Sequence, residues 1–239
     1  MKELNITYQA GDVQSEGFLV YDDKIKSSRP AIIVAHAWRG QDDFARDKAR
    51  SLAQLGYIGF AADLFGNRKN AANDEEAESL IKPLFSDRKL LQSRIIAAFD
   101  TLSQQPEVDK SRIGAIGFCF GGLAVIELLR SGTPVNSVVC FHAVLGNTGA
   151  KTTPIAKNIN GSILLLHGYD DPLVTTEDVL NTQKELNDAG VDWQMNIYGH
   201  TSHAFSNPQA HDKAKGLIYN EKINKRAWIA MKNFFEETI

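Results

Sequence analysis

The chain has 239 residues, of which 43% are hydrophobic, and a formal net charge of −3 at pH 7. This length is sufficient for one large hydrophobic core and does not require a second, so we expect a single domain over residues 1–239. Acidic and basic residues are interspersed, without the basic stripe of a nucleic-acid-binding protein. The composition therefore argues against nucleic acid as a partner and favours a small-molecule ligand.

The amino-terminal segment MKELNITYQAGD has neither the basic nor the apolar region of a secretory signal. No apolar run approaches the roughly 20 residues that a membrane-spanning helix requires. We therefore predict a cytoplasmic protein without a membrane partner, either a monomer or a homodimer. Disulfides are rare in that compartment, so Cys119 and Cys140 are expected to be reactive or buried thiols.

The first half of the chain predicts a hairpin followed by alternating strands and helices. Its expected elements are a hairpin of Leu4–Gln9 and Gly17–Asp22 around the turn Ala10-Gly11-Asp12, a buried strand at Ala31–His36, a helix from about Phe44 to Leu55, and a strand at Tyr57–Asp63. The stretch Asp74–Gln105 is rich in helix formers, and Pro83 is expected to divide it into two helices.

The second half continues the alternation. Its expected elements are a strand at Ile113–Phe118, a helix at Phe120–Arg130, strands at Ser137–His142 and Ser162–His167, a helix at Thr176–Ala189, a strand at Trp193–Tyr198 and a closing helix from about Lys213 to Glu237. This order predicts an α/β fold, with a mostly parallel central sheet, helices on both faces and the hairpin as an antiparallel edge.

An open α/β sheet binds its ligands beyond the carboxyl ends of its strands. The residues expected at those ends are His36, Asp63, Cys119, His142, His167, Asp171, Tyr198 and His203. No metal-binding spacing connects the histidines, so no metal site is predicted.

Cys119 is the central residue of Gly117-Phe118-Cys119-Phe120-Gly121, between a predicted strand and a predicted helix. This is the pattern of a nucleophile elbow with sulfur in place of oxygen. The flanking glycines permit a turn so tight that side chains there would collide with backbone. The helix N-terminus favours the thiolate. We therefore interpret Cys119 as a nucleophile and Cys140, inside an apolar strand, as a packed thiol.

The same turn offers part of an oxyanion hole. The N–H of Phe120 can donate to a developing oxyanion, and a second donor is expected from Trp38 in the loop after Ala31–His36. A glycine-rich turn can also bind a phosphate, but this one has neither a G-x-G-x-x-G spacing nor a P-loop lysine. A cysteine that merely packs in such a turn is the remaining alternative.

The order nucleophile, acid, histidine along the chain places the partners of Cys119 downstream. Asp171 follows a buried strand, with Asp170 as a close rival. His203 follows the next strand, with His200 as its rival. A carboxylate that accepts the imidazole N–H fixes the tautomer of the histidine, while the other nitrogen takes the thiol proton.

Three motifs occur in this order: Gly117-Phe-Cys119-Phe-Gly121-Gly122, Gly168-Tyr-Asp-Asp171-Pro-Leu-Val and His203-Ala-Phe205. With Ala35-His36-Ala37-Trp38-Arg39-Gly40 and Ala62-Asp63-Leu64-Phe65-Gly66, they resemble the dienelactone hydrolase family over nearly the whole chain. The resemblance implies an α/β-hydrolase fold, no cofactor, and hydrolysis of a lactone or related ester through a thioester intermediate. It also favours Asp171 and His203 over their rivals.

The chain departs from the family pattern at two positions. Ala37 stands where the dienelactone enzymes have a glutamate that helps to activate the thiol. Asn207 stands where they have an arginine that holds the substrate carboxylate, and a second such arginine corresponds to Arg88 or Arg94. These departures argue against dienelactone itself as the substrate.

We therefore predict a hydrolase of carboxylic esters or lactones, with Cys119 as nucleophile, His203 as base and Asp171 as the residue that orients the histidine. The expected pocket residues beside Trp38 and Phe120 are His36, Arg39, Phe65, Tyr169 and Phe205. A thioester or peptide hydrolase and an acyltransferase would use the same acyl-enzyme. A non-catalytic binding or redox-sensing protein with a reactive thiol is a further alternative.

Overall fold

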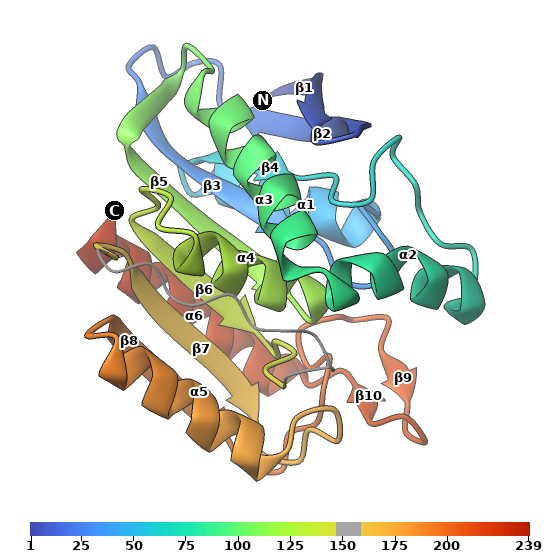
Figure 1. Ribbon diagram of the computed structural model, residues 1–239. Coiled ribbons are helices and arrows are strands. Elements are labelled where there is room, and N and C mark those ends of the chain that lie inside the picture. The colour runs from blue at the N-terminus through green and yellow to red at the C-terminus, as the bar shows by residue number, and fades with distance from the viewer. Residues whose placement is uncertain (147–158) are drawn as a thin grey trace.

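The computed structural model describes residues 1–146 and 159–239 (Figure 1). Its eight-stranded sheet has the order β1-β2-β4-β3-β5-β6-β7-β8. The strands are β1 (Lys2–Ala10), β2 (Val13–Tyr21), β3 (Arg29–Ala35), β4 (Ile58–Ala61), β5 (Val108–Phe118), β6 (Ser137–Phe141), β7 (Ser162–Gly168) and β8 (Asp192–Tyr198). The β1–β2 and β2–β4 pairs are antiparallel and the pairs from β4 to β8 are parallel, which confirms the predicted sheet and its hairpin edge.

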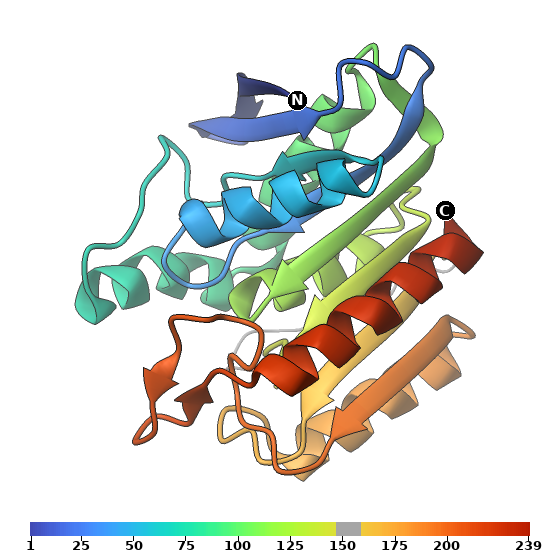
Figure 2. The ribbon, with the colours of Figure 1, turned by 180° about the vertical axis from the view of Figure 1, so that it is seen from behind.

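Helices cover both faces of this sheet. They are α1 (Asp43–Gln54), α2 (Asp74–Ser86), α3 (Arg88–Ser103), α4 (Phe120–Arg130), α5 (Thr176–Asp188) and α6 (Glu221–Thr238). Figure 1 shows α3, α4 and α5 in front of the sheet, and Figure 2, turned by 180°, shows α1 and α6 in front of its other face. No helix in the described part of the chain is long and apolar enough to cross a membrane.

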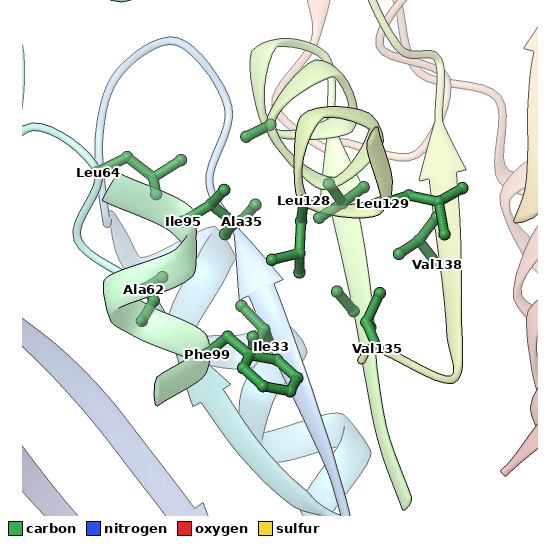
Figure 3. Close-up of a cluster of buried hydrophobic side chains, with 14 of the residues drawn as sticks. Ile33, Ala35, Ala62, Leu64, Ile95, Phe99, Leu128, Leu129, Val135 and Val138 are labelled. Atoms are coloured by element: carbon green, nitrogen blue, oxygen red, sulfur yellow. The ribbon is translucent and has the colours of Figure 1, made fainter. Parts of the chain in front are cut away.

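The apolar runs of the parallel strands produce two cores, one on each face. Successive side chains of a strand point to opposite faces. In β3, Ile33 therefore packs with residues of α3 and α4, whereas Ile32 packs with residues of α1 and α6. Figure 3 shows the first of these cores, where Phe99 of α3 lies close to Ile33 and Ile95 lies close to Ala35. Ile32 and Ile33 are both fully buried although they face opposite cores, which explains why no polar residue interrupts this apolar run of β3.

Two predicted boundaries were wrong. Pro83 lies inside α2, and the two helices separate at Asp87, whose extended backbone ends α2 and whose side chain caps α3 by accepting from Leu90 N–H. The last helix does not begin near Lys213. Residues 211–218 instead form a small sheet of β9 (His211–Asp212) and β10 (Leu217–Ile218), with Gly216 at a φ of +65° between them. A helix cannot continue through that left-handed residue, and α6 begins only after its N-cap, Asn220.

Candidate active site

The turn between β5 and α4 holds Cys119 in a conformation that side chains rarely adopt, with φ +55° and ψ −114°. A Cβ on Gly117 would lie 2.0 Å from the carbonyl oxygen of Gly121, and a Cβ on Gly121 would lie 2.1 Å from that of Ala35. Neither position can therefore carry a side chain. Cys119 N–H donates to the carbonyl of Phe141 at 3.1 Å, which fixes the turn against β6, and the residue is half-buried. The strained turn expected from the sequence is present.

Two backbone N–H groups flank this turn. Phe120 is the first residue of α4, and N–H groups in the first turn of a helix have no intrahelical acceptor. Trp38 lies in the loop after β3, and we find no acceptor for its N–H among the described residues. Both residues line the same cavity as Cys119. They are therefore available as donors to the oxyanion that forms when the sulfur attacks a carbonyl group.

The acid and the histidine come from the loops after β7 and β8. His203 Nδ1 lies 2.7 Å from Asp171 Oδ2, and both side chains are almost completely buried. The second Asp171 oxygen accepts from Leu173 N–H at 2.9 Å, so the carboxylate is held at both ends. The rivals lie elsewhere, since Asp170 and His200 are exposed to solvent. Asp171 and His203 are therefore the carboxylate and the imidazole that lie in contact.

The opposite nitrogen of His203 faces Cys119. Nε2 is buried and has no hydrogen bond of standard geometry among the described residues. The two side chains nevertheless interact. Burial lowers the pKa of His203, but the charge of Cys119, the hydrogen bond to Asp171 and the proximity of Cys119 outweigh burial and raise the pKa to about 10. Catalytic hydrogen bonds are often long without substrate. The arrangement favours an imidazolium beside the sulfur.

A cavity of about 1240 Å³ opens over Cys119 and His203. Its apolar walls include Trp38, Phe120 and Val144, and it also reaches the side chains of α2 and of residues 204–217. The residues of these two segments that line the cavity include Asp74, Glu78, Ile81, Lys82, Phe85, Asn207, His211 and Lys215. A search at the strand ends does not find them, because they lie on a helix and a long connection that cover the strand ends from outside. The signals in the sequence were the acidic first turn of α2 and, for Asn207, the comparison with the family pattern.

Four of the expected pocket residues do not line this cavity, which corrects the prediction. His36 is fully buried, and its Nδ1 contacts the carbonyl of Ala37 while its Nε2 accepts from Leu64 N–H. Phe65 packs against the rings of His36 and Phe120, one layer behind the cavity. Phe205 is fully buried, and the Tyr169 side chain is 73% exposed. Arg39 does line the cavity, as expected.

His142 is a further histidine in the cavity wall. Its ring centroid lies 4.9 Å from that of His203 at an interplanar angle of 64°. Its Nε2 lies 2.7 Å from Ser206 Oγ, and its Phe205 neighbour packs edge-on against the ring. Burial is the main reason that the pKa of His142 lies well below the usual value. The ring is therefore neutral and adds no charge beside His203.

Asp63, another residue at a strand end, has a structural role. Its two carboxylate oxygens accept from the backbone N–H groups of Glu16, Phe65, Gly66 and Arg68. His167 is buried, and burial lowers its pKa. In residues 1–146 and 159–239 we find no group of three or more His, Cys, Asp or Glu side chains that could hold a metal ion.

Comparisons with known proteins point to one family. The model of the dienelactone hydrolase family matches residues 16–239. A relative from Aquifex aeolicus, named "Putative carboxymethylenebutenolidase", is 25% identical over 97% of this chain and 96% of its own. A "Probable 2-oxo-3-(5-oxofuran-2-ylidene)propanoate lactonase" from Bradyrhizobium is 28% identical over 74% of this chain and 73% of its own.

Solved structures extend the likeness. The chain superimposes with a TM-score of 0.94 on a dienelactone hydrolase-like promiscuous phosphotriesterase from metagenomic libraries. The two are 35% identical, and the match covers 99% of this chain and 98% of the other.

Proposed function

The chain belongs to the dienelactone hydrolase family, whose activity is the hydrolysis of esters and lactones, and we propose that it cleaves a carboxylic ester or lactone through Cys119, His203 and Asp171. The observation that carries this proposal is the position of His203. One of its nitrogens contacts the buried Asp171 at 2.7 Å, and the other is directed to Cys119 at the floor of the cavity. This arrangement supports the roles of nucleophile, base and orienting acid for Cys119, His203 and Asp171.

The proposed reaction begins with attack of the Cys119 thiolate on the ester carbonyl carbon. The carbonyl electron pair moves to oxygen, where the N–H groups of Phe120 and Trp38 stabilise the charge. When the C–O bond breaks, the His203 imidazolium donates its proton to the leaving alkoxide. The product is a thioester on Cys119 and a neutral His203.

Water then completes the cycle. His203, now neutral, removes a proton from a water molecule that attacks the thioester carbonyl. Collapse of the second tetrahedral intermediate releases the carboxylic acid and restores the thiolate and the imidazolium. Asp171 keeps the histidine in one tautomer and orientation through both halves.

A pair of cysteine variants tests the nucleophile. In Cys119→Ala, hydrolysis of p-nitrophenyl acetate should fall by at least about a thousandfold, because the acyl-enzyme cannot form. Cys140→Ala is the matched control: Cys140 is fully buried in β6, away from the cavity, and its loss should cost stability but leave turnover measurable. Circular dichroism reports the fold of both. Retained turnover in a folded Cys119→Ala protein would exclude the proposal.

Alkylation by iodoacetamide at different pH values tests the charge pair. Because the pKa of His203 is raised to about 10, its cation persists from acid to mildly alkaline pH. At mildly acidic pH, alkylation of Cys119 should therefore be faster than alkylation of a free cysteine, because the imidazolium favours the reactive thiolate. In His203→Gln this advantage at mildly acidic pH should be lost. Equal pH profiles for the two proteins would favour a binding or redox-sensing thiol over a catalytic one.

The likeness to a promiscuous phosphotriesterase supports a second candidate activity. A phosphotriester is uncharged, and its phosphoryl oxygen can occupy the same N–H donors while the thiolate displaces an aryloxide from phosphorus. Paraoxon hydrolysis by the wild type and by Cys119→Ala tests this activity. Turnover that survives the substitution would exclude a role for Cys119 in it.

A further inference from the structure

Three charged side chains from distant segments meet at the wall of the cavity. Arg39 follows β3, Asp74 is the first residue of α2, and Lys215 lies between β9 and β10. Asp74 Oδ1 lies 2.6 Å from Arg39 Nη2, and Asp74 Oδ2 lies 2.6 Å from Lys215 Nζ. All three residues line the cavity that contains Cys119. One carboxylate thus bridges the two cations.

The Asp74 carboxylate offsets one of the two positive charges, and Asp212 also lies 3.9 Å from Lys215. The hydrogen bond from Lys215 is the main reason that the pKa of Asp74 is lowered, and the same contact raises the pKa of Lys215. The aspartate is therefore ionised and the lysine protonated at neutral pH. The Arg39 guanidinium also lies 5.4 Å from the centre of the Trp38 ring, which directs it along the wall beside the expected oxyanion donor.

The remaining charges of the cavity do not restore a positive field. Among residues 1–146 and 159–239, its lining contains three basic side chains, Arg39, Lys82 and Lys215, and four acidic ones, Asp42, Asp74, Glu78 and Asp212. The arginines considered from the sequence as carboxylate ligands lie outside it. Arg94 donates to the carbonyl of Ala10 and to Asp12, and Arg88 packs over the Phe85 ring.

We propose that Asp74 determines the charge specificity of this hydrolase: by holding Arg39 and Lys215, it makes uncharged acyl groups better substrates than acyl groups that carry a carboxylate. An anionic acyl group would have to displace Asp74 from both cations and approach the acidic residues around it. An uncharged acyl group meets no such competition. The inference rests on the proposed ester hydrolysis and adds the class of substrate.

A matched pair of esters measures this preference. p-Nitrophenyl hydrogen adipate carries an ionised carboxylate at neutral pH, and its methyl ester has the same acyl chain without the charge. Release of p-nitrophenolate gives kcat/KM for each, after subtraction of spontaneous hydrolysis. We expect the wild type to prefer the methyl ester, and Asp74→Asn to shift the ratio by about tenfold towards the acid, because the variant removes the carboxylate that contacts both Arg39 and Lys215.

Glu78→Gln is the matched control, since it removes the same charge from the same helix. No ion pair of Glu78 occurs in the described part of the chain, so this substitution releases no cation. The ratio should therefore shift less in Glu78→Gln than in Asp74→Asn. Equal shifts would mean that general charge in the cavity, and not the bridge, sets the preference, and would overturn the proposal.

A salt titration of the wild type gives a second readout that needs no variant. At about 1 M NaCl the Debye length is roughly 3 Å, so the preference for the methyl ester should shrink. A wild type that hydrolyses both esters equally well at low salt would also overturn the inference. If the wild type cleaves neither ester, or if the activity survives Cys119→Ala, the proposed function itself fails, which is a distinguishable result.

Discussion

Asp170 and Asp171 are adjacent in the chain but lie in different environments. Asp171 is 5% exposed and contacts His203, whereas Asp170 projects into solvent while its N–H donates to the carbonyl of Thr201. A buried carboxylate interacts with a neighbouring imidazolium much more strongly than an exposed carboxylate does, because water screens the exposed charge. Substitution of each of these adjacent residues in turn therefore tests which of them is the acid.

Asp171→Asn should lower kcat for ester hydrolysis by roughly a hundredfold to ten-thousandfold, because an amide at this place favours the wrong tautomer of His203. Asp170→Asn removes the same charge one residue earlier and should change kcat by less than about threefold. Steady-state kinetics with p-nitrophenyl acetate compares the two variants. A larger loss in Asp170→Asn than in Asp171→Asn would contradict the assignment of the acid.

At the scale of elements, the site depends on how closely two loops approach each other. Gly168 ends β7, and a Cβ there would lie 2.5 Å from the carbonyl oxygen of Thr201 and 2.8 Å from that of Ser202. The loop that carries Asp171 can therefore approach the loop that carries His203 only because residue 168 has no side chain.

Gly168→Ala should separate these loops by several tenths of an ångström and lower kcat by roughly tenfold to a hundredfold, since catalysis is sensitive to such displacements. Gly199→Ala, in the second loop, is the control, because a Cβ there meets no atom within 4 Å. Kinetics and thermal unfolding of both variants separate misplacement from loss of stability. If both variants keep wild-type kcat, the close approach is not needed.

Hydrophobic periodicity was sufficient to predict the elements of this fold. The segments Ala31–Ala35 of β3 and Ile113–Phe118 of β5, with most of β6 and β7, are buried on both faces, so each appears in the sequence as an apolar run; the first part of β5, from Val108 to Arg112, is polar and was missed. The small β9–β10 sheet was missed because two-residue strands have no period. Boundaries set by a single cap, such as Asp87, were also misplaced, since Pro83 is the stronger local signal.

The site was predictable where a motif fixes the backbone and less so where side-chain direction matters. The glycine pattern around Cys119 reports a turn, and this turn is present. The end of a strand, in contrast, does not say which way a side chain points. His36 therefore looked like a pocket residue although its ring bonds to neighbouring backbone. Asp74 comes from a helix far from any strand end, and only tertiary structure brings it to the cavity.

At the scale of the whole molecule, the two cores are separated by the sheet, and Cys140 lies in the middle of it. The side chain is fully buried in the core shared with α3 and α4, and its thiol contacts the carbonyl oxygen of Gly122 at 3.6 Å. Burial also raises the pKa of this thiol. A reagent can reach Cys140 only if the strand and the helix above it come apart, which would expose much of that core.

In the Cys119→Ala protein, Cys140 is the remaining cysteine, so its labelling reports this opening alone. Because domains of this kind unfold with about 5–15 kcal/mol, labelling by a thiol reagent in buffer should be at least about a thousandfold slower than that of the unfolded chain. The rate should rise with urea along the same curve as loss of circular dichroism, since opening and global unfolding coincide. Wild-type protein should show one fast thiol and one slow thiol under the same conditions. Fast labelling of both thiols in buffer would mean that β6 opens locally. That result would contradict the view that β6 gives the turn at Cys119 a rigid support.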